Sequence, residues 1–362
     1  MASGELLLAV SGADRDPENA MRWLGASTAH LFALRDGTLA PLSTADVGCN
    51  AMSASLLPTS IAPAAAATMA LTDMADVRGV GVGGVSLFTL SAATGVTLSA
   101  GSMSRAGSGG RSPCAVAVCP QSAADGAVLI AVACYEGPGE DNDGVVSVLS
   151  AASDANGWSF AGRAGQCARA PSPGWGEPLC CVSHADIGGA TPGDGRQDAA
   201  HPHGVTWWCE EGAERTLLVC DLGANVVVAY GVDATTGRTE RRGLCRLHLG
   251  AGPRHSVLLP PSANTGAART LLVVNELDST IVAIALRPVA ALLVERAVTT
   301  LVLTNGAERH DEWLLELARM YGVPQRVVDL GSKGPLAPFP VTPAVTHYVA
   351  PSHFVAQHVN VA

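Results

Sequence analysis

Three short polar clusters carry the residue types that acid–base and anion-binding chemistry requires. They lie at 201–204, 252–255 and 275–279, each at one end of an apolar run that predicts a β-strand. A histidine can act as a general base, an arginine can hold an anion or a developing oxyanion, and a carboxylate can orient either one. His203, Arg254 and Glu276 supply these three groups. Because the clusters occur in register, we expect them to line one shared pocket.

Strand geometry predicts how the histidines beside these residues are directed. Side chains alternate between the two faces of a strand, so His201 and His203 should share a face and Arg254 and His255 should not. If Arg254 points into the pocket, His255 is expected to pack between sheets. The His201-x-His203 spacing could hold zinc. A third ligand is not evident, since Asp198 is close only along the chain, and we predict no metal and no cofactor.

The apolar runs that position these clusters are repeated. Arg-Thr-Leu-Leu-Val at 215–219 recurs at 269–273, and each copy is followed by a polar link and a second apolar run, at 226–230 and 281–285. Looser copies lie upstream, and turns with glycine, such as 234–237, separate the strands. A strand, a tight link and another strand, repeated every few tens of residues, indicate the blades of a β-propeller.

The segment from about 183 to 286 resembles the seven-bladed β-propeller lactonase family, which includes 6-phosphogluconolactonases and fungal 3-carboxy-cis,cis-muconate cyclases. The matching motifs stand in the family's order: Arg-Gln at 196–197, His-Pro-His at 201–203, Cys-Asp-Leu-Gly-Ala-Asn at 220–225, Gly-Ala-Gly-Pro-Arg-His at 250–255 and Val-Asn-Glu-Leu-Asp-Ser-Thr at 274–280. The resemblance implies an all-β propeller whose hub holds the matching histidine, arginine and glutamate.

On this resemblance, the expected activity is hydrolysis of a sugar lactone, in first place 6-phosphogluconolactone of the pentose phosphate pathway. His203 would take the proton from water, Arg254 would bind the anion, and Glu276 would orient them. Four further residues are expected to contact the substrate: Arg196, His201, His255 and Asn275. A histidine base predicts that activity falls with acid near the ordinary pKa of about 6.5.

Each assignment has a plainer alternative. Arg196 lies in a loop rich in Gly, Asp and Pro and could equally be a solvated charge. His203 could bond a backbone carbonyl at a sheet edge, and Glu276 could belong to a turn made by its neighbours. Two other functions compete with hydrolysis. One is a cyclase in which Arg254 holds a carboxylate and His203 moves a proton, and the other is a non-catalytic propeller that serves as a binding platform.

The C-terminal part departs from the repeat. We expect propeller blades over 1–288 and a divergent segment over 289–362. Its pattern predicts a strand at 299–304, an amphipathic helix at 308–321 and a strand at 326–330, a small α/β piece in place of regular blades. Residues 351–356 could be a remnant of a blade-opening strand.

Composition indicates which classes of binding partner to expect. The net charge of −10 and the lack of a basic run argue against nucleic acid, and a small-molecule lactone is the expected partner. The N-terminus lacks the basic start and long apolar run of a secretion signal, and no membrane-spanning segment is expected. The ten cysteines form no CxxC pair and are interpreted as buried apolar residues rather than disulfide or zinc ligands. We therefore expect a cytoplasmic protein; the sequence does not predict its oligomeric state.

Overall fold

Every regular element in the described part of the chain is a β-strand. The computed structural model describes residues 5–10, 14–15, 23–24, 27–35, 38–46, 51–58, 66–74, 83–93, 97–100, 104–123, 126–154, 157–160, 176–191, 195–210, 215–259, 269–286, 293–304 and 325–329. The expected all-β class is confirmed within these residues.

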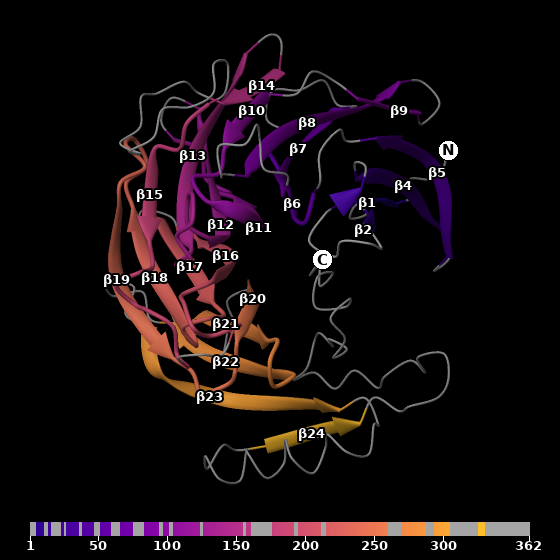
Figure 1. Ribbon diagram of the computed structural model, residues 1–362. Coiled ribbons are helices and arrows are strands. Elements are labelled where there is room, and N and C mark those ends of the chain that lie inside the picture. Colours follow the sequence, from indigo (N-terminus) through magenta and orange to yellow (C-terminus); the bar gives the residue numbers. More distant parts are fainter. Residues whose placement is uncertain are drawn as a thin grey trace. The chain divides into compact units, whose positions relative to one another are not determined.

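The chain divides into two compact units. Unit 1 contains residues 1–186, 209–215 and 232–239, and unit 2 contains 187–208, 216–231 and 240–362. Both units are made up of sheets in which most neighbouring strands are antiparallel and follow one another in sequence, as the labelled strands of Figure 1 show. A four-stranded antiparallel meander of this kind is the unit from which a propeller is built.

Unit 1 contains three larger sheets and one strand pair. The first sheet is β1 (Glu5–Val10), β4 (Thr28–Arg35) and β5 (Thr38–Asp46), and the pair is β2 (Asp14–Arg15) with β3 (Trp23–Leu24). The second is β6 (Ala54–Leu56), β7 (Ala66–Asp73), β8 (Gly84–Ala93) and β10 (Ser104–Gly107), with β9 (Thr97–Ala100) on β8. The third is β11 (Arg111–Val118), β12 (Val128–Glu136), β13 (Val145–Asp154) and β14 (Gly157–Phe160), with β15 (Cys180–Ser183) on β13.

The strands of two further sheets lie largely in unit 2. The first is the meander β16 (Pro202–Trp208), β17 (Arg215–Asp221), β18 (Val226–Val232) and β19 (Thr239–Arg246). The second is β20 (Pro253–Leu258), β21 (Arg269–Asn275), β22 (Thr280–Leu286), β23 (Leu293–Thr304) and β24 (Gln325–Asp329). The repeated sequence at 215–219 and 269–273 therefore forms the second strand of each sheet, as the repeat predicts.

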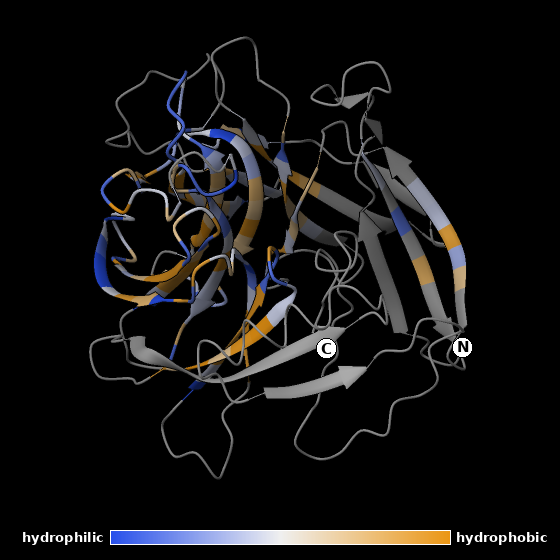
Figure 2. Ribbon diagram, turned by 60° about the horizontal axis from the view of Figure 1, so that its bottom comes forward, coloured by the Kyte–Doolittle hydropathy of each residue, from blue (hydrophilic) through white to orange (hydrophobic). Residues whose placement is uncertain are grey.

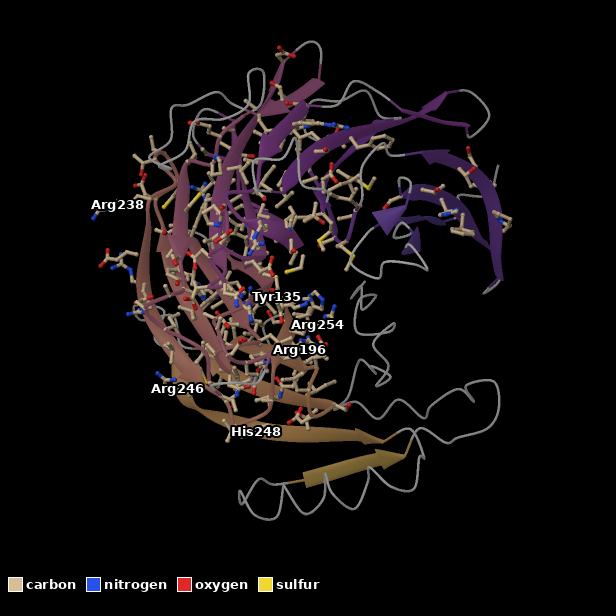
Figure 3. All side chains as sticks on the ribbon, viewed as in Figure 1. Tyr135, Arg196, Arg238, Arg246, His248 and Arg254 are labelled. Atoms are coloured by element: carbon tan, nitrogen blue, oxygen red, sulfur yellow. The ribbon has the colours of Figure 1, made fainter. Side chains whose placement is uncertain are left out.

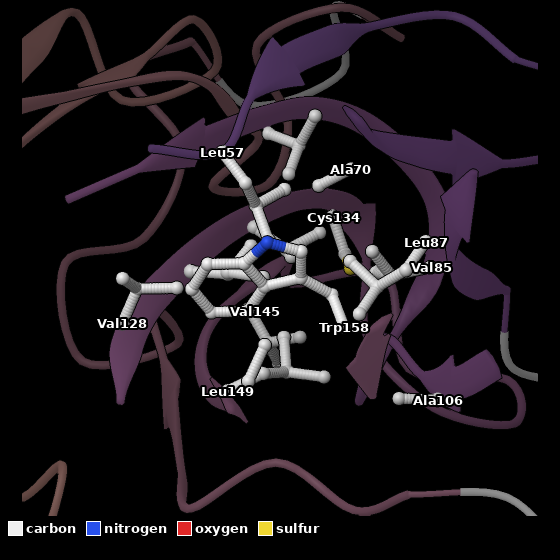
Figure 4. Close-up of a cluster of buried hydrophobic side chains, with 14 residues drawn as sticks. Leu57, Ala70, Val85, Leu87, Ala106, Val128, Cys134, Val145, Leu149 and Trp158 are labelled. Carbon is white, nitrogen blue, oxygen red and sulfur yellow. The ribbon is translucent and has the colours of Figure 1, made fainter. Parts of the chain in front are cut away.

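Hydrophobic burial holds the strands of each unit together. Along the ribbon, hydrophobic residues concentrate on strands and hydrophilic ones on loops (Figure 2). In unit 1, Trp158 of β14 packs in a buried cluster with Leu57, Leu87 and Leu149 (Figure 4). Unit 2 has its own cluster of strand residues, which includes Leu218, Val227, Leu271, Val273 and Ile284. Burying a leucine or isoleucine fully stabilises the fold by roughly 1.5–3 kcal/mol.

The opening strands of three sheets share a β-bulge directly after a proline. In β11, β16 and β20 the pairing register shifts so that one residue has no partner opposite it. That extra residue is Cys114, His203 or Arg254, respectively. A bulge tolerates a proline, and it re-aims the side chain of the extra residue. Two of the three predicted catalytic residues therefore owe their direction to the same backbone irregularity.

The C-terminal strands depart from the meander. β24 pairs with β23 in parallel, which a short hairpin cannot connect. The strands expected at 299–304 and 326–330 correspond to the end of β23 and to β24, whereas the helix expected at 308–321 and the remnant strand at 351–356 lie outside the described residues. The division at residue 288 stays a prediction.

The cysteines are not all in the state expected from the sequence. Seven described cysteines are free, among them the fully buried Cys134 and Cys220. Cys181, however, is disulfide-bonded, so the interpretation of the cysteines as apolar side chains without disulfides is wrong at this position.

In the residues with a described conformation, no helix has both the length and the apolar character to cross a membrane.

Candidate active site

Glu276 joins two arginines in unit 2. Its Oε2 accepts a hydrogen bond from Nη1 of Arg254 at 2.5 Å, and its Oε1 accepts one from Nη2 of Arg196 at 2.7 Å. The three side chains come from the end of β21, from β20 and from the loop before β16. Figure 3 shows Arg196 and Arg254 close together, whereas Arg246 extends from the outer strand β19. The loop charge Arg196 is thus part of an ion-pair network, which we call the arginine–glutamate cluster.

Two histidines adjoin this cluster. Nε of Arg254 donates to Nε2 of His255 at 3.4 Å, and the ring of His255 meets that of His203 edge to face, with centroids 5.4 Å apart. The expectation that Arg254 and His255 lie on opposite faces is therefore wrong, whereas the contact of His255 with His203 of the neighbouring sheet agrees with the expected packing between sheets. The strict two-residue alternation behind it fails because Arg254 is the extra residue of a bulge, so that consecutive side chains approach each other.

The members of the cluster differ in burial, and together they carry a net positive charge. Only 4% of the Arg254 side chain and 10% of the Glu276 side chain are exposed, whereas 43% of the Arg196 side chain is. A buried carboxylate is costly unless it is paired, and both of its oxygens are paired here. With neutral histidines, two guanidinium groups and one carboxylate carry a net charge of +1. The site therefore favours an anion, and Arg196 is the member that solvent reaches.

Both histidines are held neutral. Burial, with the nearby charges of Arg254, His255 and Arg196, lowers the pKa of His203 well below its ordinary value of 6.5. Burial and the charge of Arg254 lower the pKa of His255 to about 4, although Glu276 raises it. At neutral pH both imidazoles are therefore uncharged, and in His255 the lone pair of Nε2 already accepts the hydrogen bond from Arg254.

A second layer of hydrogen bonds ties the loops of the site together. Nε2 of Gln197 donates to Oδ1 of Asn225 at 2.7 Å, and the backbone N–H of Gly252 donates to the same oxygen at 2.7 Å. Asn225 thereby links the residue after Arg196 to the start of β20, which carries Arg254. Sequence reasoning missed this role for Gln197 and Asn225, although both stand in the motifs that matched the family.

Gly204 allows the first strands of the two sheets to approach closely. A Cβ at this position would lie 2.3 Å from the backbone oxygen of Arg254 and 3.1 Å from Cα of His255. Such contacts with backbone atoms cannot be relieved by rotating a side chain. Gly204 of β16 therefore sets the spacing of His203, Arg254 and His255.

Replacing Gly204 with alanine is expected to displace β20 and to lower both stability and activity. We expect a loss of about 1–3 kcal/mol, the usual cost of overpacking a tight contact, measured by urea unfolding. The matched control is Gly107→Ala in β10, because a Cβ there meets nothing within 4 Å. Equal unfolding midpoints for the two variants would contradict the role of Gly204.

The remaining two predicted contact residues lie in turn networks beside the cluster. The backbone N–H of His201 donates to Oδ1 of Asp221, and its ring lies 3.8 Å from Oδ1 of Asp198. Nδ2 of Asn275 donates to Oγ1 of Thr280 at 2.8 Å, within the link between β21 and β22. Their roles as substrate contacts stay predictions.

No group of three or more His, Cys, Asp or Glu side chains suited to a metal ion occurs among the residues that the structure describes.

Comparisons with known proteins agree on the fold. A family model described as "Lactonase, 7-bladed beta-propeller" matches residues 74–312, about two thirds of the chain. No curated protein matches the sequence significantly.

Three solved structures are similar to this chain in fold. A protein from Lactobacillus plantarum aligns at 19% identity with a TM-score of 0.52, over 81% of this chain and 66% of its own. A protein from Bacteroides fragilis, described as a "putative 6-phosphogluconolactonase", aligns at 17% identity with a TM-score of 0.53, over 83% of this chain and 68% of its own. A protein of the same description from Bacteroides uniformis has 17% identity, a TM-score of 0.51, and coverages of 82% and 67%. The chain thus spans about two thirds of the length of these structures.

Proposed function

Because the chain belongs to the seven-bladed β-propeller lactonase family, we propose that it hydrolyses a sugar lactone, and that the substrate is 6-phosphogluconolactone. One observation carries the proposal: a neutral, buried histidine pair adjoins an arginine–glutamate cluster of net positive charge. Lactone opening needs a base for water and a cation or N–H donor for the oxyanion, and this site combines the two. The description of two structural neighbours supports the choice of substrate.

The proposed reaction uses His203 as the proton carrier. Water attacks the lactone carbonyl carbon while the imidazole takes its proton. The carbonyl oxygen becomes an oxyanion, which Arg254 stabilises. When the intermediate collapses, the ring C–O bond breaks, and the ring oxygen leaves with the proton from the imidazolium. The product is the open-chain acid, with no change of oxidation state and no cofactor.

The two arginines divide the remaining work. Arg254, almost fully buried, is positioned by Glu276 on one side and His255 on the other, so its guanidinium is fixed before the substrate arrives. Arg196, with 43% of its side chain exposed, is assigned to the phosphate of the substrate, because a guanidinium binds phosphate oxygens in a bidentate manner. Glu276 binds both arginines, and its negative charge offsets the repulsion between the two guanidinium groups, which would otherwise move apart.

The pH–rate profile is expected to stay flat through pH 6.5 and to fall only at lower pH. The fall in activity is expected at a lower pH than an ordinary histidine pKa predicts, because burial and Arg254 lower the pKa of His203 in the folded protein. A base with a lowered pKa remains unprotonated until the pH drops to that value, so its activity persists further into acid. Initial rates between pH 5 and 8 test this, and a half-maximal point at or above pH 6.5 would contradict it.

The same shifts affect stability. Between the ordinary pKa and the lowered folded-state values, the unfolded chain binds protons that the buried His203 and His255 do not. Folding stability should therefore decrease as the pH falls below about 6.5. Rates must be taken from protein that urea unfolding shows to be folded at each pH.

A substrate panel tests the proposed function. The full chain is assayed against freshly prepared 6-phosphogluconolactone, unphosphorylated gluconolactone and 3-carboxy-cis,cis-muconate. Hydrolysis above the spontaneous rate, with preference for the phosphorylated lactone, is the expected result. If the protein lactonises the muconate, the cyclase function is favoured over lactone hydrolysis. If it turns over none of the three compounds, the proposal of an enzyme is contradicted and a binding platform is favoured.

A further inference from the structure

A pair of cysteines belongs to unit 1, whereas the arginine–glutamate cluster belongs to unit 2. Cys119 directly follows β11, Cys209 directly follows β16, and both belong to unit 1. Their Sγ atoms are 3.4 Å apart, and both cysteines are free. A disulfide needs sulfur atoms at about 2.05 Å. The two sulfurs therefore have to approach by little more than an ångström for the bond to form.

A cation stands beside this pair. Arg215, the first residue of β17, donates from Nη2 to the carbonyl oxygen of Ser122 at 2.6 Å. Its Nε is buried and has no hydrogen-bond acceptor among the described residues. A thiolate is a much stronger acceptor than a thiol, and Arg215 interacts with Cys119 through its charge and through a side-chain hydrogen bond. The positive charge favours ionisation of the pair.

The electrostatics of the pair agree with this geometry. The hydrogen bond with Cys209, assisted by the backbone at Gln121 and by Arg215, lowers the pKa of Cys119 to about 7 against the effect of burial. The hydrogen bond with Cys119 and burial raise the pKa of Cys209. The first of the two thiol protons is therefore lost near neutral pH, while the second is retained. By contrast, burial raises the pKa of Cys134 and of Cys220 to about 12.

We propose that Cys119 and Cys209 form a dithiol site that is oxidised to an intramolecular disulfide by exchange with a low-molecular-weight disulfide. Cys119 is fully buried, whereas Cys209 is partly exposed. Cys209 therefore meets the external disulfide first, after the shared thiolate charge moves to its sulfur and the proton to Cys119. Cys209 attacks one sulfur of the reagent and expels one thiolate. Cys119 then loses its proton, attacks Cys209, and expels the second thiolate. Two thiols are oxidised and one disulfide is reduced.

Oxidised glutathione is the reagent for the test. The reduced full chain is treated with it at pH 7.5, free thiols are alkylated in denaturant, and disulfide-linked peptides are identified by mass spectrometry. The expected product is a peptide pair that joins Cys119 to Cys209, while Cys134 and Cys220 remain fully alkylated. Cys181, which is disulfide-bonded in the folded chain, is expected to re-form its own link and is distinguished by its own peptide.

Single variants test the order of the steps. Cys119→Ser is expected to accumulate glutathione on Cys209, and Cys209→Ser to leave Cys119 unmodified. Arg215→Gln is expected to slow disulfide formation roughly tenfold at pH 7, because the thiolate fraction falls. The proposal is overturned if Cys119 and Cys209 stay alkylatable, if either pairs with another cysteine, or if they react no faster than Cys134 and Cys220.

Discussion

Replacing Arg254 with alanine is expected to lower kcat/KM for 6-phosphogluconolactone by about a thousandfold, the upper range for loss of one oxyanion donor. Arg254 is almost fully buried, bonded to Glu276 and held against His255. An arginine fixed in this way needs no reorganisation when the oxyanion forms. The matched control is Arg246→Ala, which removes an exposed arginine from the end of β19 and should leave kcat/KM unchanged.

A lysine variant separates charge from geometry. Arg254→Lys keeps the positive charge beside Glu276 and is expected to fold, but it cannot reproduce the planar fork of donors. We expect kcat/KM between those of the wild type and Arg254→Ala. If Arg254→Ala folds and retains more than a tenth of the wild-type kcat/KM, Arg254 does not stabilise the transition state.

Replacing Glu276 with glutamine is expected to destabilise the protein by about 3 kcal/mol, the low end of the range for breaking a buried ion pair. The change leaves the buried guanidinium of Arg254 without its counter-charge. The expected loss of stability lies at the low end of this range because Arg196 is half-exposed and its charge is screened by water. In addition, glutamine retains an acceptor oxygen. Urea unfolding of the full chain measures the difference.

An exposed pair supplies the control for this change. Glu240 is paired with Arg242 at 2.9 Å, with 63% of its side chain exposed. Glu240→Gln should cost no more than about 1 kcal/mol, as is usual for surface ion pairs. Equal losses for Glu276→Gln and Glu240→Gln would mean that the arginine–glutamate cluster does not stabilise the fold. Activity should fall in Glu276→Gln alone, because only there do the two arginines of the site lose their common partner.

The repeat pattern of the sequence was sufficient to predict β17, β18, β21 and β22. The copies at 215–219 and 269–273 are second strands, and the runs that follow them are third strands. The repeat period and the turn glycines are sufficient to predict these strands, because the neighbouring strands of each of these sheets follow one another directly along the chain. The sequence also predicted that Glu276 orients Arg254, and the two side chains are hydrogen-bonded.

The contact between the side chains of Arg254 and His255 could not be predicted, for a physical reason. Alternation holds only while every residue has a partner across the ladder, and the bulge at Arg254 interrupts it. A proline opens the bulged segment in β11, β16 and β20 alike, so the repeated Pro-x pattern was the available signal. The contact of Cys119 with Cys209 joins residues 90 positions apart, and no local pattern encodes it.

The most direct test of the proposed site is the hydrolysis of fresh 6-phosphogluconolactone by His203→Gln beside the wild type. Glutamine has a similar reach but cannot accept the proton of water. A wild-type rate well above spontaneous hydrolysis, reduced about a hundredfold or more in the folded variant, is the result that general-base catalysis by His203 predicts. A variant as active as the wild type would contradict it.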